Sequence, residues 1–319
     1  MDINYPFTST GQNHAGKDFS VNTLRGLKKH VFVLTDGCPI YDIDFISSTD
    51  GLLTNLDHLS DETIGNSAFY VWFSVDENCV EPVRRIIKCG GLFIPPMSFD
   101  KHQYHRTSRY VTQSINEANN RTGGVYGLYQ LFENICQAVD ITQDVEGDFL
   151  EMGVFTGSSA LTAMIHMRNR GIQRKCWLMD TFEGFTYNEA TASSDIIWGG
   201  THLQNVNSQI ESLQNKMVGV GQDYSFVVGN VIADPIPPEI KKLALVNVDV
   251  DLYDATKAAL EKSSPFVQKG GVIMCEDSTA TPALYGAFVA MSDFLNTDEG
   301  KKYFRVYTTT HHLLLKKEM

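Results

Sequence analysis

The sequence lacks the features expected of an exported, membrane-spanning or zinc-binding protein. Its six cysteines show no C-x-x-C spacing, which argues against a disulfide framework or a zinc site and favours free thiols in a reducing compartment. The first twenty residues are mostly polar, unlike a signal peptide, and no stretch has the uninterrupted apolar length of a membrane span. We therefore expect a cytoplasmic protein with no membrane partner.

Positive charge is also scarce. The chain has 26 Lys and Arg against 38 Asp and Glu, a formal net charge of −12, so we expect no nucleic-acid partner, because phosphate binding needs a basic face. Hydrophobic residues make up 43% of the chain and charged residues 20%, which is typical of a globular protein. Its 319 residues suffice for one large domain or for a domain with an added one.

The sequence has no G-x-G-x-x-G fingerprint, which counts against a nicotinamide dinucleotide as ligand. Its glycine-rich stretch has the spacing E-x-G-x-x-x-G instead, formed by Glu151, Gly153 and Gly157. An acidic residue at the mouth of such a loop suits a ligand with hydroxyls or a positive charge rather than phosphates. S-adenosylmethionine has this chemistry, although a strand, turn and helix with no ligand remains an alternative.

The residues around this loop predict a buried strand followed by a helix. The apolar run at 149–154 is typical of a strand covered on both faces. Ser158 and Ser159 are suitable N-cap residues, and 160–166 is predicted to be helical. A glycine turn between strand and helix marks the nucleotide-type pocket of doubly wound folds.

After Gly157 the pattern alternates regularly between strands and helices, which predicts a mostly parallel sheet with helices on both faces. The last two strands should form a closing pair, with one of them antiparallel. The expected strands are 176–180, 224–229, 243–249, 270–276, 303–308 and 312–316, and the expected helices are 203–217, 255–266 and 282–295.

Three segments follow from the change in composition along the chain. Residues 1–97 are predicted to form a small α/β region of unknown role, with strands near 30–34, 67–75 and 92–94 and a helix at 80–88. Residues 98–122 are polar and are predicted to be a linker or a lid, from which His102, Tyr104 and His105 could reach a pocket. The main domain is predicted at 123–319, beginning with an amphipathic helix at 125–139 and carrying a second lid candidate at 188–200.

Four carboxylates follow two neighbouring predicted strands. Asp249 and Asp251 come at the end of one strand, and Glu276 and Asp277 at the end of the next. Ligands of doubly wound sheets bind outside the carboxyl ends of the strands, so these acids should meet at one rim. Buried like charges repel unless protons are retained or a cation lies among them, and oxygen ligands suit Mg²⁺, Mn²⁺ or Ca²⁺. The alternative is that Asp251 and Asp254 merely cap the following helix.

Such a metal could bind a substrate hydroxyl and lower its pKa, while a spare carboxylate takes the proton. A further acid, Asp180, ends the predicted strand 176–180 and lies 29 residues after Glu151. Folds of this class place a carboxylate in this range to bind ribose hydroxyls.

Four segments together are similar to the macrocin O-methyltransferase family of class I S-adenosylmethionine-dependent enzymes, over roughly residues 120–319. They are 149–157 (FLEMGVFTG), 180–185 (DTFEGF), 248–253 (VDVDLY) and 270–277 (GGVIMCED). The resemblance implies a doubly wound, Rossmann-like methyltransferase fold. It also implies Mg²⁺-dependent methylation of hydroxyls on the sugars of antibiotics and similar glycosides, and family members often associate, so a homo-oligomer stays open.

The resemblance also assigns roles to residues. Asp249, Glu276 and Asp277 would hold the metal, with Asp249 thereby part of the catalytic centre, and Asp251 would be the catalytic base. Glu276 stands where the family usually has Asp, and Phe155-Thr156 where it tends to have an aromatic and then a basic residue. The cofactor-binding set predicted from the resemblance and the loop ends is Glu151, Gly153, Gly157, Ser158, Asp180, Thr181 and Gly229.

The sequence thus predicts an S-adenosylmethionine- and Mg²⁺-dependent methyltransferase acting on a hydroxyl of a small-molecule acceptor, such as a sugar or glycosylated natural product. Two alternatives remain open at this point. One is a non-catalytic binding protein on a methyltransferase fold, since fold does not fix function. The other is a nicotinamide-dependent oxidoreductase. The acceptor, and whether oxygen or nitrogen is methylated, do not follow from the sequence.

Overall fold

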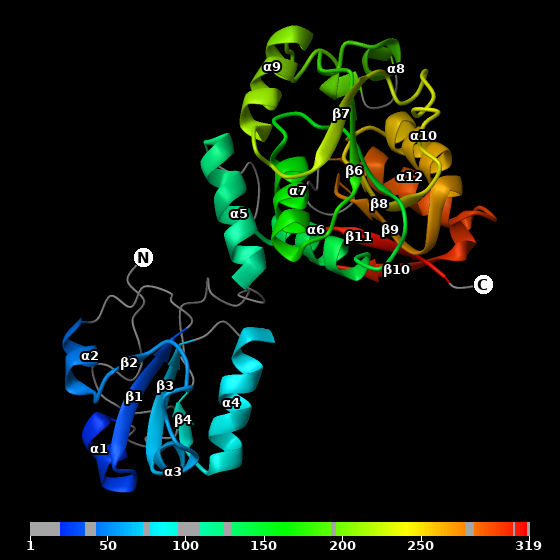
Figure 1. Ribbon diagram of the computed structural model, residues 1–319. Coiled ribbons are helices and arrows are strands. Elements are labelled where there is room, and N and C mark those ends of the chain that lie inside the picture. Colours follow the sequence, from blue (N-terminus) through cyan, green and yellow to red (C-terminus); the bar gives the residue numbers. More distant parts are fainter. Residues whose placement is uncertain are drawn as a thin grey trace. The chain divides into compact units, whose positions relative to one another are not determined.

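The computed structural model describes residues 20–35, 43–72, 77–94, 109–123, 129–192, 196–277, 284–308 and 310–317. The chain divides into two compact units, residues 1–109 and 110–319 (Figure 1). Each unit has its own sheet and its own hydrophobic clusters.

The first unit is built on a four-stranded parallel sheet in the order β2-β1-β3-β4. Side chains of β1 alternate between its faces, so Val31 and Val33 pack with Leu24 of α1, whereas Leu34 packs with Ile64 of α3 and Ile86 of α4. The elements are α1 (Val21–Leu27), β1 (His30–Thr35), α2 (Ile43–Ser48), β2 (Leu52–Leu53), α3 (Asp61–Gly65), β3 (Ser67–Trp72), α4 (Glu77–Cys89) and β4 (Leu92–Ile94).

The second unit contains a seven-stranded sheet in the order β10-β11-β9-β8-β5-β6-β7. Only β11 among these strands runs against its neighbours, since it pairs antiparallel with both β9 and β10. This confirms the predicted doubly wound sheet with one antiparallel strand near the C-terminus. The strands are β5 (Asp148–Met152), β6 (Lys175–Asp180), β7 (Asp223–Val228), β8 (Leu243–Val248), β9 (Val267–Cys275), β10 (Tyr303–Tyr307) and β11 (His312–Lys316).

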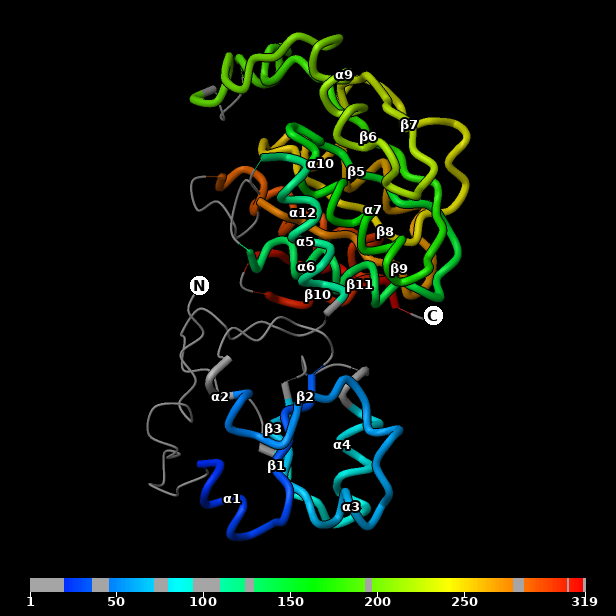
Figure 2. The backbone as a smooth tube through the Cα atoms, turned by 60° about the vertical axis from the view of Figure 1, so that its left-hand side comes forward, coloured from blue at the N-terminus to red at the C-terminus, as the bar shows by residue number. Residues whose placement is uncertain are grey.

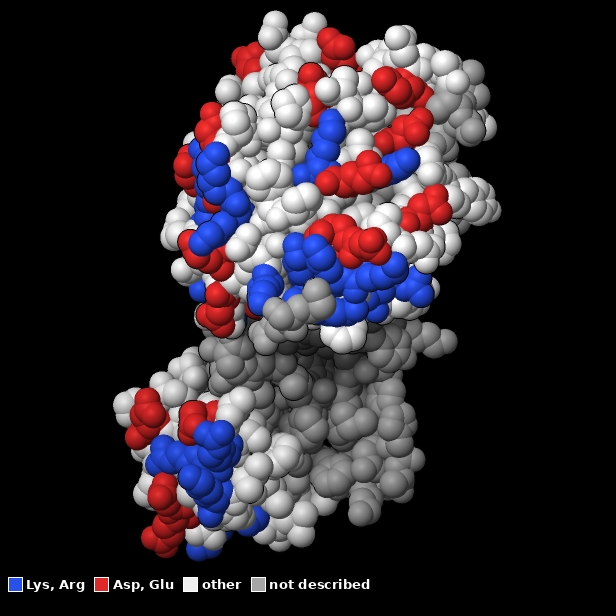
Figure 3. All heavy atoms as spheres, turned by 90° about the vertical axis from the view of Figure 1, so that its right-hand side faces the viewer, with Lys and Arg blue, Asp and Glu red and all other residues white. Residues whose placement is uncertain are grey.

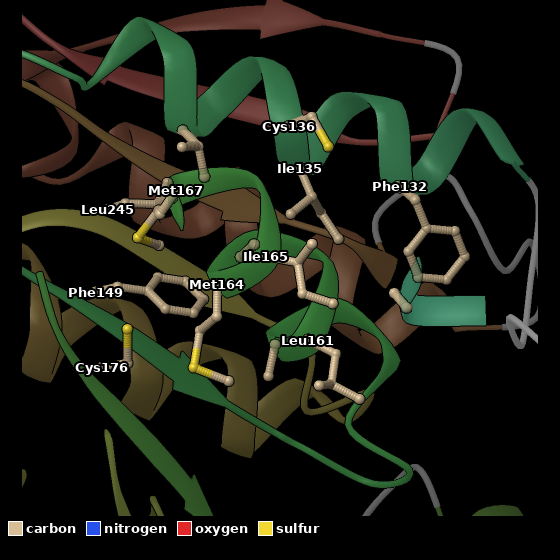
Figure 4. Packing of buried hydrophobic residues seen from close by; sticks show 14 of the residues in the cluster. Phe132, Ile135, Cys136, Phe149, Leu161, Met164, Ile165, Met167, Cys176 and Leu245 are labelled. Atoms are coloured by element: carbon tan, nitrogen blue, oxygen red, sulfur yellow. The ribbon is translucent and has the colours of Figure 1, made fainter. Parts of the chain in front are cut away.

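Helices cover both faces of this sheet, and Figure 2 follows their alternation with the strands. One hydrophobic cluster joins α5, α6, α7 and α9 to one face, and another joins α10 and α12 to the opposite face. Figure 4 shows Phe132 and Ile135 of α6 and Leu161 and Ile165 of α7 packing in the cluster that contains Phe149 of β5. The helices are α5 (Arg109–Thr122), α6 (Tyr129–Ile141), α7 (Ser158–Arg170), α8 (Asn188–Ala192), α9 (Val206–Met217), α10 (Tyr253–Ser263) and α12 (Tyr285–Asn296), with 3-10 turns η1 (Ile196–Trp198), η2 (Ser264–Phe266) and η3 (Gly300–Lys302).

Two local predictions need correction. The N-cap of α7 is Gly157, in the left-handed conformation with φ 79°, so Ser158 and Ser159 belong to the helix rather than to its cap. The lid candidate at 188–200 was expected to be a loop, but it contains α8 and η1. Ala190 of α8 is buried in a hydrophobic cluster, and composition alone does not reveal this burial.

The polar segment 98–122 is divided by the structure. Residues 109–122 form α5, whose Val111, Ile115 and Ala118 are buried in the cluster beside α6 and α7. His102, Tyr104 and His105 lie outside the described residues. Among the helices that the structure describes, none combines the length and the apolar character needed to cross a membrane.

The surface carries both signs of charge. Figure 3 shows Lys and Arg beside Asp and Glu on the face of the second unit that it presents. Some exposed charges of the second unit pair locally, including Lys301 with Asp298 at 2.8 Å and Lys242 with Glu146 at 2.6 Å. Exposed pairs of this kind contribute little to stability.

Candidate active site

A cavity of about 270 Å³ opens at the carboxyl ends of the parallel strands of the second unit. The loops that follow β5, β6, β7, β8 and β9 all contribute to its wall. This is where a doubly wound sheet binds its ligand, because the neighbouring loops diverge there and leave a crevice.

The cavity brings together most of the residues that the sequence singled out. Glu151 and Gly157 do not line it: Glu151 is only 1% exposed, and Gly157 lies at the start of α7. The predicted residues that do line it are Gly153, Ser158, Asp180, Thr181, Gly229, Asp249, Asp251, Glu276 and Asp277.

Gly153 holds the end of β5 against the end of β8. Its φ is 86°, and a Cβ built on it would lie 1.7 Å from the backbone oxygen of Asp249. Real Cβ atoms never approach a backbone oxygen so closely, so only glycine fits without moving β8. Gly153 thereby fixes the spacing between the glycine loop after β5 and Asp249 at the end of β8.

Asp180 accepts backbone hydrogen bonds from two neighbouring turns. Its Oδ2 accepts from the N–H of Val154 at 2.7 Å and of Phe155 at 3.0 Å, and its Oδ1 accepts from the N–H of Phe182 at 2.8 Å. The carboxylate therefore joins the loop after β5 to the turn that follows β6.

Glu151 is buried beneath the loop. The Asn247 side chain and the Ala160 N–H are its polar neighbours, but neither carboxylate oxygen makes a hydrogen bond of standard geometry with a described residue. Burial, reinforced by nearby Glu276, holds the pKa of Glu151 well above its usual range. In this structure Glu151 thus favours its protonated form.

Three aspartates converge on the acidic rim of the cavity. Asp249, Asp251 and Asp277 each place a carboxylate oxygen within 4.8 Å of the other two. The N–H of Asp251 donates to Oδ2 of Asp277 at 2.9 Å, and Asp251 has φ 65°, which is uncommon outside glycine. Helix α10 begins at Tyr253 with Leu252 as its N-cap and no side-chain cap, so Asp251 does not cap it.

Proximity and burial oppose ionisation of this cluster. Burial, followed by the negative charges of neighbouring acids, raises the pKa of Asp249 and of Asp277 well above the usual range. Burial also raises the pKa of Asp251 to about 7. Such a group of acids must retain protons or share a cation, and its all-oxygen donors fit Mg²⁺.

Glu276 borders the same cavity but is held differently. It is 8% exposed, its Oε2 accepts no hydrogen bond from a described residue, and that atom lies 3.8 Å from Nε2 of buried His311. Nδ1 of His311 lies 3.0 Å from the hydroxyl of Thr310, which belongs to the same turn. Buried His311 therefore lies behind the acidic rim, beside Glu276.

Sequence reasoning missed an aromatic wall of the cavity. Phe155 and Phe185 each make an edge contact with His202, at ring-centroid distances of 5.2 and 5.3 Å, and Tyr187 lies beside Phe185 at 6.4 Å. All four residues line the cavity. The aromatic content of 182–187 was a signal for Phe185 and Tyr187, but nothing in the sequence connects His202 with them.

A Ser–His–Asp arrangement also occurs away from the cavity. Nδ1 of His166 lies 3.1 Å from the Ser114 hydroxyl, and its Nε2 lies 3.1 Å from Oδ1 of Asp140. Ser114 and His166 are completely buried, and the Ser114 hydroxyl donates to the Tyr110 carbonyl at 2.6 Å. No substrate can reach this serine, so the group joins α5, α6 and α7 structurally.

Comparison of this chain with known protein families identifies its family. The profile of the family described as Macrocin-O-methyltransferase (TylF) matches residues 97–302, which is more than half of the chain. The match begins before α5 and includes every strand of the large sheet except β10 and β11.

Two curated relatives come from Streptomyces. A 4'-O-methyltransferase of 8-demethyl-8-(2,3-dimethoxy-alpha-L-rhamnosyl)-tetracenomycin-C from Streptomyces olivaceus is 27% identical over 150 residues, which cover 44% of this chain and 57% of the relative. Demethyldecarbamoylnovobiocin O-methyltransferase from Streptomyces niveus is 26% identical over 191 residues, which cover 56% of this chain and 72% of the relative.

Among solved structures, the O-methyltransferase NovP superposes with a TM-score of 0.54 at 17% sequence identity. The superposition covers 66% of this chain and 98% of NovP. This likeness shows the fold, and the matched share leaves about a third of this chain without a counterpart in NovP.

Proposed function

Because this chain belongs to the macrocin-O-methyltransferase (TylF) family, we propose that it transfers the methyl group of S-adenosylmethionine to a hydroxyl of a small-molecule acceptor. The observation that carries the proposal is that the glycine loop after β5 and the acidic ends of β8 and β9 line the same cavity. The sulfonium methyl is already activated, so the protein has mainly to align it with the hydroxyl and remove a proton.

The cofactor is proposed to lie along the loops after β5, β6 and β7. Gly153, Ser158, Thr181 and Gly229 line that side of the cavity, together with Asp180. Glu151 and Gly157 would act from beneath, Gly157 by starting α7 in the left-handed conformation and Glu151 by supporting the loop.

The acceptor side is proposed to be the acidic rim. Asp249, Glu276 and Asp277 would hold Mg²⁺, which when bound would lower the pKa of the acceptor hydroxyl. Asp251 is the candidate base, because its carboxylate lies at the rim within 4.8 Å of those of Asp249 and Asp277. Without a metal, burial raises its pKa to about 7, and Mg²⁺ would favour the ionised form that accepts a proton. The curated relatives act on a rhamnosyl-bearing tetracenomycin and on a novobiocin precursor, which supports a sugar or glycosylated natural product as the acceptor class.

Thermal melting tests this proposal directly. The protein is heated with S-adenosylmethionine, with S-adenosylhomocysteine or with NAD, each in Mg²⁺ and in EDTA. We expect a higher melting temperature with both adenosyl ligands, because a ligand that binds only the folded state stabilises it by mass action. A shift with NAD alone would favour an oxidoreductase, and no shift with any of the three would remove the catalytic assignments.

The metal assignment has its own variant. Asp249→Ala is expected to abolish turnover and Mg²⁺ binding while the affinity for S-adenosylhomocysteine changes little. The substitution removes only the carboxylate that groups with Asp251 and Asp277, and it keeps the main-chain oxygen against which Gly153 packs. Asp254→Ala, an exposed acid in the first turn of α10, is the matched control. Unchanged turnover in Asp249→Ala would remove its metal role.

A further inference from the structure

Asp180 ends β6, the position from which doubly wound folds present a carboxylate to ribose hydroxyls. In this chain the carboxylate already has partners. The N–H groups of Val154, Phe155 and Phe182 donate to it at 2.7, 3.0 and 2.8 Å. The hydroxyl of Thr181 also donates to Oδ1, at 3.4 Å. A carboxylate has about four acceptor sites, so these four donors leave none free for a ribose diol, which brings two donors.

Two of the three N–H donors belong to strained residues. Phe155 has φ 42° and Phe182 has φ 55°, and such values are genuine outliers for bulky side chains. Conformations of this kind persist only where surrounding contacts enforce them. Charge-assisted bonds from the backbone to a carboxylate are among the stronger hydrogen bonds available for this purpose.

The two strained turns form adjacent parts of the cavity wall. Phe155 lies in the loop after β5 and contacts His202, whereas Phe182 follows β6, is 1% exposed and packs on Phe226. Movement of either turn would displace the wall on which a ligand rests. A single carboxylate between them fixes both at once.

We propose, first, that Asp180 is a positioning residue that holds the loops after β5 and β6 in their binding conformation. We propose, second, that its carboxylate does not form hydrogen bonds with the ribose hydroxyls. The second half of this statement rests on the proposed function, since it presumes an adenosyl ligand. The first half concerns the protein alone. Asp180 therefore acts on the cofactor through Val154, Phe155 and Phe182.

Amide hydrogen exchange of the ligand-free full chain tests the first half. We expect the N–H groups of Val154, Phe155 and Phe182 to be protected in the wild type, although they lie at loops and turns. Asp180→Asn should accelerate their exchange by about tenfold or more, because it removes the charge that these bonds share. Asp223→Asn is the matched control: it alters an exposed carboxylate on β7 that pairs with Lys175 at 3.0 Å.

A binding cycle tests the second half. Dissociation constants of S-adenosylhomocysteine and of its 2′-deoxy and 3′-deoxy counterparts are measured by calorimetry for wild type and Asp180→Asn. We expect the variant to bind all three more weakly by the same factor, so that the ratio between deoxy and parent ligand stays as in the wild type. A ratio that is large in the wild type and falls to one in the variant would show that Asp180 reads the ribose.

The outcomes separate this inference from the proposed function. If the wild type binds none of the adenosyl ligands, the proposed function fails, while the exchange measurement still decides whether Asp180 holds the loops. If Asp180→Asn does not fold, the wild-type measurement suffices, because rapid exchange of the three N–H groups would overturn the inference. Asp180→Glu, which keeps the charge and displaces it by one methylene, then serves as the variant for the binding cycle.

Discussion

At Asp251, one substitution can remove the proposed proton-accepting group and still keep the backbone conformation. Its φ of 65° is tolerated by asparagine, so Asp251→Asn removes the ionisable group without changing the backbone that brings it to the rim. If Asp251 is the base, turnover should fall by about 10²- to 10⁴-fold, which is the usual contribution of general base catalysis.

Mn²⁺ binding, followed by electron paramagnetic resonance, should be retained in the same variant. Steady-state kinetics gives the loss of rate, and Asp254→Asn is the control because Asp254 is exposed on the neighbouring turn. Full activity of Asp251→Asn would exclude it as the base, and loss of Mn²⁺ would make it a metal ligand instead.

Glu133 shows that a shifted carboxyl need not belong to the active site. It is 3% exposed on α6, and burial raises its pKa from 4.5 to about 7. The folded state therefore holds a proton that the unfolded state releases, so stability should fall as the pH rises from 4.5 to about 7. Glu133→Gln carries no titrating group and should be increasingly more stable than the wild type across this window, with no further gain above it.

Urea unfolding at several pH values measures this difference. The control is Glu146→Gln, which alters a carboxylate whose side chain is 78% exposed. A constant difference between Glu133→Gln and the wild type at every pH would show that Glu133 has the same pKa in both states.

At the scale of the elements, two glycines in similar conformations should respond very differently to substitution. Gly153 and Gly171 have φ of 86° and 73°, but only at Gly153 would a Cβ meet backbone, the oxygen of Asp249 at 1.7 Å. Gly171→Ala should cost about 1–2 kcal/mol, the penalty of the left-handed conformation alone.

Gly153→Ala should cost more than Gly171→Ala, because the ends of β5 and β8 must also move apart. Denaturant unfolding gives both free energies, and the affinity for S-adenosylhomocysteine should fall only in Gly153→Ala. Equal losses of stability in the two variants would mean that the close approach of β5 to β8 is not needed.

The order of elements was predictable because each strand of the large sheet carries its own signal. Leu243 to Val248 is buried throughout and is apolar except for Asn247, as expected of a central parallel strand. The grouping of Asp249, Asp251 and Asp277 was predictable too, because it follows from topology alone. Helix α5 was not, since its polar composition hides Val111, Ile115 and Ala118, whose burial depends on packing against α6 and α7.

Details that depend on side-chain geometry did not follow from the sequence. Spacing predicted that Asp180 binds the ribose hydroxyls of a cofactor; the structure places it in the cavity wall, and that role stays a prediction. Spacing could not reveal that the N–H groups of Val154, Phe155 and Phe182 donate hydrogen bonds to the Asp180 carboxylate. These bonds depend on the φ angles of two turns. His202 was missed for the same reason, since only folding brings it between Phe155 and Phe185.

At the scale of the whole molecule, the two units have separate cores. The clusters of the first unit contain residues between Val21 and Leu92, and those of the second contain residues between Val111 and Leu315. Every described residue that lines the cavity belongs to the second unit. A core that shares no side chains with another can unfold by itself.

Scanning calorimetry of the full chain should therefore show two transitions. S-adenosylhomocysteine at about 100 times its dissociation constant should stabilise the second unit by about 2.7 kcal/mol, and so raise one transition and leave the other in place. NAD at the same concentration is the control. If both transitions move together, the ligand stabilises a single cooperative structure, and residues 1–109 must then contribute to the folding of the unit that binds the cofactor.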